Sequence, residues 1–174
     1  MNQVPRGRSQ LLLLAALFFG PLLAAVLLYF VMPGLQPHAR TNYGELISPA
    51  QPVPALQLVD LDAKPHGRDA LLGKWSYVYV GGEHCDRACA DKLYQIRQIR
   101  TLLNEKRLRV QRVYLAPSAE ALPALHAALA ATHPDLRFYA EAGAAKPLRT
   151  LLGSRAADAQ ALYLVDPLGN WLMV

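Results

Sequence analysis

Residues 75–89 read WSYVYVGGEHCDRAC and contain the transition on which the fold depends. The first six form a β-branched and aromatic run, and Gly81-Gly82 is the punctuation expected where a buried strand turns into a loop. Beyond the loop, apolar side chains recur at spacings of three and four, at Leu93, Ile96, Ile99 and Leu103. This periodicity predicts an amphipathic helix over roughly residues 86–105. A strand, a loop with two cysteines and a helix are therefore expected in succession.

The same alternation continues toward the C-terminus. Strands are predicted at residues 109–115, 136–139, 161–165 and 170–174, helices at 117–131 and 146–152, and an edge strand upstream at 56–60. Asp166-Pro167-Leu168-Gly169 suits a tight hairpin turn between the last two strands. Because parallel neighbours require helical crossovers, this order predicts an α/β domain with a mixed sheet and helices on both faces. The last hairpin ends in a strand at Val174, so we expect a partner on that sheet face or a shortened chain.

An uncharged stretch lies near the start of the chain, at residues 11–32, LLLLAALFFGPLLAAVLLYFVM. At a rise of about 1.5 Å per residue it crosses a hydrocarbon core roughly 30 Å thick, which predicts a transmembrane helix. A cleaved signal peptide is the alternative, but its apolar region is usually about 7–15 residues long and precedes a small-residue cleavage site. Arg6 and Arg8 precede the stretch and Arg40 follows it. The positive-inside bias therefore places residues 1–10 in the cytoplasm and the remainder across the membrane.

Proline and glycine are dense at residues 33–54, a composition that predicts an extended tether without regular structure. With 174 residues, the chain is long enough for one ordinary domain plus an anchor and too short for two independent cores. We therefore predict a single globular domain over residues 55–174.

The formal net charge of +5 is unevenly distributed. Residues 87–112 contain eight basic side chains and only two acidic ones, Asp91 and Glu105. A positive face can steer an acidic partner or lie toward anionic lipid headgroups, but an ordinary solvated helix face is the better explanation of these charges. Nucleic acid is excluded as a partner, because the domain lies across a membrane from it and lacks the interleaved aromatic or glycine pattern of such modules.

Cys85 and Cys89 are the only cysteines, and they lie where the predicted strand gives way to the helix. At a helix N-terminus, unpaired backbone N–H groups and the helix dipole stabilise a thiolate, and His84 and Arg87 nearby would add to this effect. Cys85 is thus expected to be the more reactive thiol. Cys89 lies one helical turn further on the same face, so the sulfurs can form a disulfide or a two-thiolate site for a soft ion.

An inert disulfide that staples the loop is one alternative, favoured by an oxidising compartment. Closing so short a loop gains little entropy, however, and two cysteines cannot supply a zinc site of four thiolates. For Cu(I), two thiolates and one imidazole would make a suitable site. His84 adjoins a thiol, which would strain joint ligation, and no third ligand is evident. The other histidines are expected to be solvated: His38, His66, His126 and His133.

Three stretches resemble the Sco/SenC family of thioredoxin-fold proteins, which serve copper delivery to cytochrome c oxidase. EHCDRAC at residues 83–89 follows a strand and is similar to that family's T-H-C-P-x-x-C-P. The next helix and strand lead to Leu115-Ala116-Pro117, and YLVDPLG at residues 163–169 is similar to Y-L-I-D-P-x-G. The resemblance covers roughly residues 55–174 and implies a thioredoxin-like mixed sheet flanked by helices, preceded by one N-terminal transmembrane helix.

The chain departs from the pattern of that family, and from that of thioredoxin-type exchange enzymes, at several positions. The copper-binding histidine of the family lies five residues before the tyrosine of Y-L-I-D-P, and the corresponding residue here is Asp158, whose carboxylate is a hard ligand poorly suited to Cu(I). Asp86 and Ala90 stand where the family has prolines. Thioredoxin-type exchange enzymes also place a cis-proline just before the strand equivalent to residues 161–165, and residues 157–160 contain none.

The resemblance implies a membrane-tethered accessory protein for cytochrome c oxidase assembly, anchored in the inner membrane with its domain in the periplasm. Cys85 would be the nucleophile or first thiolate, Cys89 its partner, His84 a group that tunes them, and Asp158 a further member of the site. The dithiol would hold copper(I), or reduce the thiols of a copper site in an oxidase subunit or copper chaperone. A general thiol-disulfide oxidoreductase and a non-catalytic assembly scaffold are the alternatives.

Overall fold

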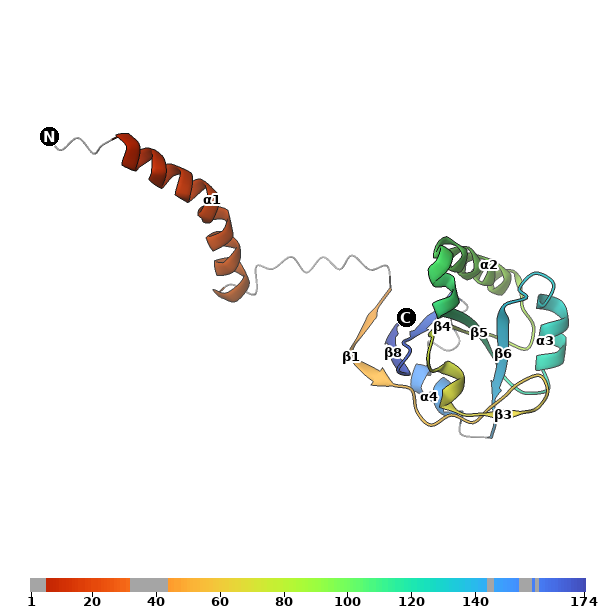
Figure 1. Ribbon diagram of the computed structural model, residues 1–174. Coiled ribbons are helices and arrows are strands. Elements are labelled where there is room, and N and C mark those ends of the chain that lie inside the picture. Colours follow the sequence, from red (N-terminus) through yellow and green to blue (C-terminus); the bar gives the residue numbers. More distant parts are fainter. Residues whose placement is uncertain (1–5, 32–43, 144–145, 154–157, 159) are drawn as a thin grey trace. The chain divides into compact units, whose positions relative to one another are not determined.

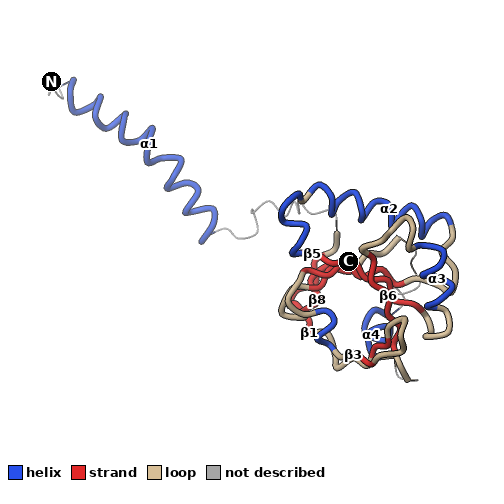
Figure 2. Tube along the Cα trace, turned by 45° about the vertical axis from the view of Figure 1, so that its right-hand side comes forward, coloured by secondary structure: helices blue, strands red, loops and turns tan. Residues whose placement is uncertain are grey.

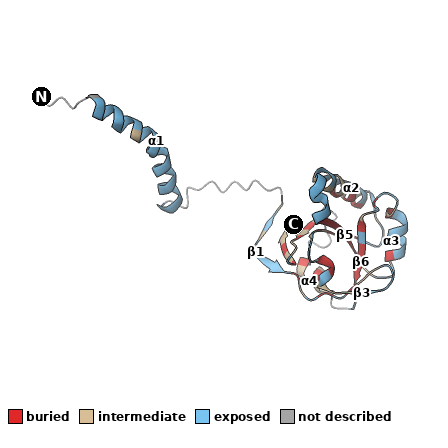
Figure 3. Cartoon of the chain, in the orientation of Figure 1, coloured by how far each residue is buried: buried red, intermediate tan, exposed pale blue. Residues whose placement is uncertain are grey.

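The computed structural model describes residues 6–31, 44–143, 146–153, 158 and 160–174, in two compact units that divide between Tyr43 and Gly44. The first unit contains helix α1 (Arg6–Val31), in which residues 7–31 are long and apolar enough to cross a membrane. Its apolar side chains are exposed (Figure 3), as expected for a helix whose apolar surroundings would be lipid. The predicted span is thus a helix up to residue 31, and Met32 lies outside the described residues.

The second unit is built on an eight-stranded mixed sheet with the order β1-β8-β7-β4-β5-β6-β2-β3 (Figure 1). Its strands are β1 (Leu46–Pro52), β2 (Leu58–Val59), β3 (Pro65–His66), β4 (Trp75–Val80), β5 (Val110–Ala116), β6 (Leu136–Glu141), β7 (Tyr163–Val165) and β8 (Asn170–Met173). β4, β5 and β6 are parallel, and every other neighbouring pair in the sheet is antiparallel. The mixed sheet predicted from the sequence is confirmed.

Helices cover both faces of this sheet (Figure 2). α2 (Arg87–Leu102), followed by the 3-10 helix η3 (Asn104–Arg109), connects β4 to β5, and α3 (Leu122–Leu129) connects β5 to β6. α2 and α3 pack in one buried cluster, whereas α4 (Pro147–Leu152) and the 3-10 helix η2 (Arg68–Leu71) pack in a second cluster on the other face. Each parallel pair is therefore bridged by a helix, as the sequence predicts.

The central strands position the cysteines. β4 occupies the six residues predicted for it, and β5 is buried along its whole length beside it. The register runs from Trp75 opposite Val110 to Val80 opposite Leu115. The loop after β4 therefore leaves the sheet at its carboxyl edge, and α2 begins there.

β1 lies within the segment predicted to be a tether without regular structure, so that prediction is wrong for residues 46–52. β1 is an edge strand that pairs with β8 on one side. Prolines such as Pro49 and Pro52 are tolerated there because an edge strand bonds with only half of its backbone groups. The compact unit thus begins at Gly44 rather than at residue 55, and residues 33–43 lie outside the described residues.

Two further elements differ from expectation. β2 is shorter than the edge strand predicted at residues 56–60 and pairs on both sides, so β3 occupies the edge instead. α3 starts at Leu122 rather than at residue 117, because Pro123 in the first turn favours initiation at that point. The final hairpin forms as predicted, with the Asp166 carboxylate accepting hydrogen bonds from the Leu168 and Asn170 N–H groups. β8 pairs with β7 on one side and with β1 on the other, so it is not an edge strand.

Candidate dithiol site

Cys85 and Cys89 form a disulfide at the start of α2, with their Cα atoms 5.2 Å apart. Asp86 is the N-cap of this helix, and its carboxylate accepts a hydrogen bond from the Cys89 N–H at 2.9 Å. Capping of this kind fixes the point at which a helix begins, and here it fixes the turn that holds both cysteines. Cys89 is 3% exposed, whereas Cys85 is half-buried. A partner from solution therefore meets Cys85 first.

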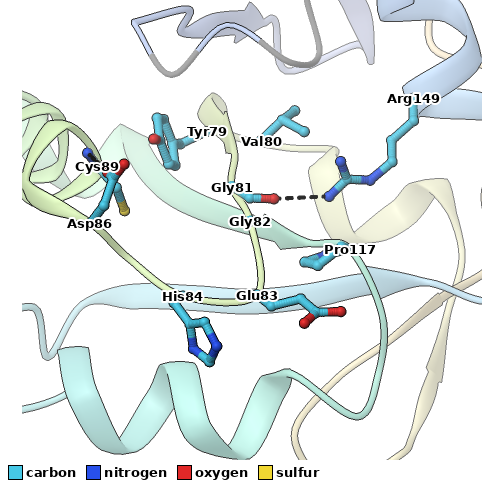
Figure 4. Close-up of a pocket in the computed structure, with 10 residues that line it drawn as sticks. All are labelled: Tyr79, Val80, Gly81, Gly82, Glu83, His84, Asp86, Cys89, Pro117 and Arg149. Carbon is cyan, nitrogen blue, oxygen red and sulfur yellow. Dashed lines mark hydrogen bonds between the residues drawn. The ribbon is translucent and has the colours of Figure 1, made fainter.

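An open pocket of about 390 Å³ lies beside the disulfide (Figure 4). Its wall combines the end of β4, the loop that follows it, the start of α2, Pro117 after β5 and Arg149 on α4. Cys89 and Tyr79 border it from one side, and Figure 4 shows Arg149 reaching toward the Gly81 carbonyl oxygen from the other. The pocket thus lies at the carboxyl edge of the sheet, where the parallel strands end.

The loop between β4 and α2 is held against β5 by Tyr114. The Tyr114 hydroxyl donates a hydrogen bond to the Gly82 carbonyl oxygen at 3.0 Å. A Cβ at position 81 would collide with the hydroxyl and ring of Tyr114, so the close approach requires glycine. Burial raises the pKa of Tyr114, and the charge of nearby Tyr79 raises it further. The phenol therefore keeps its proton and remains a donor.

Arg149 ties the ends of β4 and β5 together. Its guanidinium donates hydrogen bonds to the carbonyl oxygens of Gly81 at 3.2 Å and Leu115 at 3.0 Å. The Glu141 carboxylate accepts the backbone N–H groups of Leu148 and Arg149, which fixes the start of α4 and hence the position of this side chain. Burial lowers the pKa of Arg149, and the Glu141 charge opposes that shift. The loop that carries the cysteines is therefore anchored by side chains from two elements, Tyr114 of β5 and Arg149 of α4.

Two carboxylates influence the electrostatics of the pocket. Burial raises the pKa of Tyr79, and the charges of Asp86 and Asp158 raise it further. Asp158 is exposed, and its carboxylate accepts a hydrogen bond from the Gln160 N–H at 2.8 Å. The structure therefore brings Asp158 close enough for its charge to act on the pocket wall, as does the helix-capping Asp86.

The two basic neighbours of the cysteines, His84 and Arg87, form few interactions with the rest of the domain. His84 is exposed and forms no hydrogen bond or ion pair with the described residues; Figure 4 shows its ring directed away from Cys89. The Arg87 side chain is 96% exposed and lies 3.9 Å from Asp91, which offsets its charge. The roles predicted for His84 and Asp158 stay predictions.

The remaining histidines do not complete a metal site. Among the described residues, no group of three or more His, Cys, Asp or Glu side chains could hold a metal ion. His66 pairs with Asp60 at 2.7 Å, and His126 packs edge-on against Phe138. The prediction that His133 is solvated is wrong: it is 5% exposed because it packs beside Arg112 in the interior. His38 lies outside the described residues.

Sequence reasoning missed three members of this site. Asp86 could have been found, since an Asp directly before an amphipathic run is an N-cap signal. Tyr114 and Arg149 carry no such signal, because only the sheet topology and α4 bring them to the end of β4.

A family model described as "Transmembrane-like, thioredoxin-like, C-terminal domain" matches residues 75–174, and one described as "Transmembrane-like, N-terminal domain" matches residues 2–31. The chain belongs to this transmembrane-like, thioredoxin-like family. The first match begins at β4 and includes both cysteines, Tyr114 and Arg149, so the site lies wholly within the family's domain. Among curated proteins, no relative matches the chain of this family member.

Solved structures show which variety of the fold this family member has. Yeast Sco1 with copper bound is 22% identical at a TM-score of 0.57, with 72% of this chain and 81% of that one covered. Arabidopsis thaliana ScoI with copper bound is 21% identical at 0.52, covering 68% and 83%. BsSco, a Sco-family cytochrome c oxidase assembly protein with a disulfide switch, is 15% identical at 0.50, covering 74% and 85%. The domain thus has the Sco/SenC-like form of the thioredoxin fold.

Proposed function

We propose that this protein is a membrane-anchored accessory factor for cytochrome c oxidase assembly that reduces a disulfide in a copper-site protein through Cys85 and Cys89. The observation that carries the proposal is the disulfide between a half-buried Cys85 and a buried Cys89 beside an open pocket. Disulfide exchange needs one sulfur that the partner can reach and a second that resolves the mixed disulfide. α1 would anchor the chain in the inner membrane, with the domain in the periplasm.

The chemistry follows from these positions. In the reduced protein, the Cys85 thiolate attacks a disulfide of the target, forms a mixed disulfide and displaces one target thiolate. The Cys89 thiolate then attacks Cys85, which releases the second target thiolate and leaves the Cys85–Cys89 disulfide seen in the structure. Two electrons pass to the target, whose thiolates take up two protons. A two-electron thiol reductant in the same compartment must return the protein to its dithiol form.

Two features favour exchange over an inert staple. Only three residues separate the cysteines, and closing a short loop stabilises a fold less than the roughly 3 kcal/mol of a 15-residue loop. The disulfide also borders the pocket, whose wall includes the exposed residues Gly82 and Glu83, where a target chain can dock. The Sco-like fold and the disulfide switch of BsSco support the same assignment.

Transfer of Cu(I) as cargo is the second candidate, and the copper-bound Sco structures of yeast and Arabidopsis thaliana favour it. Thiolates are soft ligands that suit Cu(I), so the reduced Cys85–Cys89 pair fits a low-coordinate ion. Asp158 and His84 complete no third ligand position with them, since the described residues contain no cluster of three suitable side chains. Two thiolates alone would hold the ion for passage to a partner.

Trapping of the mixed disulfide tests the first proposal. The reduced full chain in nanodiscs is mixed with the oxidised copper-binding domain of an oxidase subunit and run on a non-reducing gel. Cys89→Ser should accumulate a covalent complex through Cys85, whereas Cys85→Ser should not, because Cys89 is buried. Complexes with neither variant, together with normal oxidase assembly by the double serine variant, would leave a scaffold as the function.

Anaerobic titration with Cu(I) against a chelator of known affinity tests the second candidate on the same reduced chain. Binding of one ion per chain that both serine variants lose would establish a copper carrier. Failure to compete would remove that candidate and leave disulfide exchange unaffected.

A further inference from the structure

A second surface of the domain lies at the opposite end of the central strands from the disulfide. An open groove there is lined by Trp75 and Tyr77 of β4, Leu103 after α2 and Leu164 of β7. All four side chains are half-buried. η3 borders the groove, and the half-buried apolar side chains of β4 and β7 leave apolar sheet surface partly facing solvent beside it.

Basic side chains rim this groove. Lys106 and Arg109 line it, and Arg107 lies between them on η3. All three are exposed, and none forms an ion pair with an acidic side chain in the part of the chain that the structure describes. Glu105 is the one acidic residue of η3. The charge on this 3-10 helix is therefore available to an external anion.

Large apolar side chains protrude beside these cations. Leu102 at the end of α2 is 78% exposed and Leu108 in η3 is 71% exposed. Two leucines held in water at such exposure, next to an apolar groove, form the kind of surface that marks an interaction site. Residues 102–109, LLNEKRLR, combine three leucines with three cations, a composition similar to that of segments that lie in the lipid headgroup region.

We propose that Leu102, Leu103, Lys106, Arg107, Leu108 and Arg109, here named the η3 patch, dock the domain on a bilayer that contains anionic lipid. Cations near an anionic surface each stabilise the docked state, and the leucines would enter the headgroup boundary. Trp75 and Tyr77, which line the adjoining groove, are of the type that settles at that boundary. The proposal rests on the membrane anchor of the proposed function.

The length of the connection makes a weak surface contact effective. Residues 32–43 join α1 to the domain, and twelve residues reach at most about 40 Å when fully extended. A domain confined to that distance meets the bilayer at high effective concentration, so a weak contact is enough to keep it docked. The same patch on an untethered protein would bind lipid only weakly.

Docking at this end of the sheet would orient the disulfide. Trp75 begins β4 and the loop that leads to Cys85 follows its last residue, Val80. Six residues of strand at about 3.3 Å each separate the two ends by roughly 20 Å. The pocket would therefore face away from the lipid, toward a target disulfide on a domain that stands above the membrane.

Tryptophan quenching by lipid tests this inference on the full chain in nanodiscs. The chain has two tryptophans; Trp75 lines the groove beside the patch and Trp171 is buried in the core. With lipids that carry a quencher near the headgroup, we expect at least twofold stronger quenching in discs containing phosphatidylglycerol than in phosphatidylcholine alone. The difference should disappear in high salt and in Trp75→Phe.

Two sets of variants separate the contributions. Lys106→Glu/Arg107→Glu/Arg109→Glu should abolish the dependence on anionic lipid, and Leu102→Ser/Leu108→Ser should reduce quenching in both lipids. Arg137→Glu, a charge reversal at an exposed position of β6 outside the patch, should behave as wild type. Equal quenching of wild type and the triple variant would overturn the proposal, as would disc-independent cross-linking between two copies through Leu108→Cys.

The trapping assay of the proposed function is run on the same variants. Patch variants that release the lipid but still form the mixed disulfide through Cys85 would support both inferences separately. Failure of trapping with intact lipid contact would remove the exchange function and leave the docking surface standing.

Discussion

The carboxylate of Asp86 accepts the backbone N–H of Cys89, so the residue that starts α2 also places a negative charge beside the disulfide. Asp86→Asn keeps a side-chain acceptor for the helix but removes the charge that opposes a neighbouring thiolate. We expect the reduced variant to react with iodoacetamide about fivefold faster at pH 7, a change of about 1 kcal/mol. Asp86→Ala should in addition lower the free energy of unfolding by about 1 kcal/mol, because the cap is lost. An unchanged rate in Asp86→Asn would show that the carboxylate does not oppose the thiolate.

Substitution of the two loop glycines should give very different results. Gly81→Ala brings a methyl group into the Tyr114 ring and should cost about 1–3 kcal/mol of unfolding free energy. Gly82→Ala is the matched control, since its Cβ would meet the nearest neighbouring atom, the His84 carbonyl oxygen, at 3.6 Å. Urea denaturation followed by tryptophan fluorescence measures both. Equal losses in the two variants would contradict the role given to the Tyr114 contact.

Arg112 is fully buried and donates two hydrogen bonds to the Asp135 carboxylate, which also pairs with Arg100 at 2.9 Å. Arg112→Met removes the buried partner and should cost about 3 kcal/mol or more of unfolding free energy. Arg100→Met removes the more exposed partner and should cost less, which urea denaturation would show. A larger loss in Arg100→Met would mean that Arg112 is not the main partner of Asp135.

The stability of the domain should fall as the pH drops below about 6.5. Burial, with the charges of Arg112 and Arg97 next, lowers the pKa of His133. The unfolded chain therefore takes up a proton near pH 6.5 while folded His133 stays neutral, so the unfolded state binds more protons and is stabilised relative to the folded state. Denaturant midpoints measured from pH 8 to pH 5 should decrease, and His133→Gln should flatten the curve. A flat wild-type curve would contradict this prediction.

A separate loss of stability should appear in stronger acid, below about pH 4. Burial alone would raise the pKa of Asp135, but hydrogen bonding and charge from Arg112 and the charge of Arg100 together lower it. Its contribution to stability is therefore complete above about pH 4 and lost as the pH falls through the folded pKa. In Asp135→Asn the slope of the denaturant midpoint below pH 4 should be shallower than in wild type, which circular dichroism can follow.

Local sequence signals were enough to predict the central elements. The run at residues 75–80 and the hairpin at Asp166–Gly169 depend on residues adjacent in the chain, and both form as predicted. β1 was not predicted, because its prolines argue against a strand and its partner β8 lies more than a hundred residues away. Propensity describes a segment alone, whereas an edge strand is stabilised by the neighbour that it finds.

The residues of the site also fall into those that local sequence signals predict and those that only the assembled fold brings together. Cys85 and Cys89 could be predicted from their spacing and from the strand before them. Arg149 could not, because its contact with Gly81 joins residues from two elements that meet only after the sheet is assembled. His133 was placed on the surface for the same reason: nothing in its neighbours shows that Arg112 and Asp135 will enclose it.

The pairing of β1 with β8 sets an order of events during synthesis. Leu46 lies opposite Met173, so the first strand of the domain to leave the ribosome finds its partner in the last one. β4, β5 and β6 can assemble earlier, because only α2 and α3 lie between them in the chain. Until the final hairpin emerges, the edge strand remains a single extended chain beside a nearly complete sheet. A chaperone that binds unpaired strands would find this nascent chain a client only during that interval.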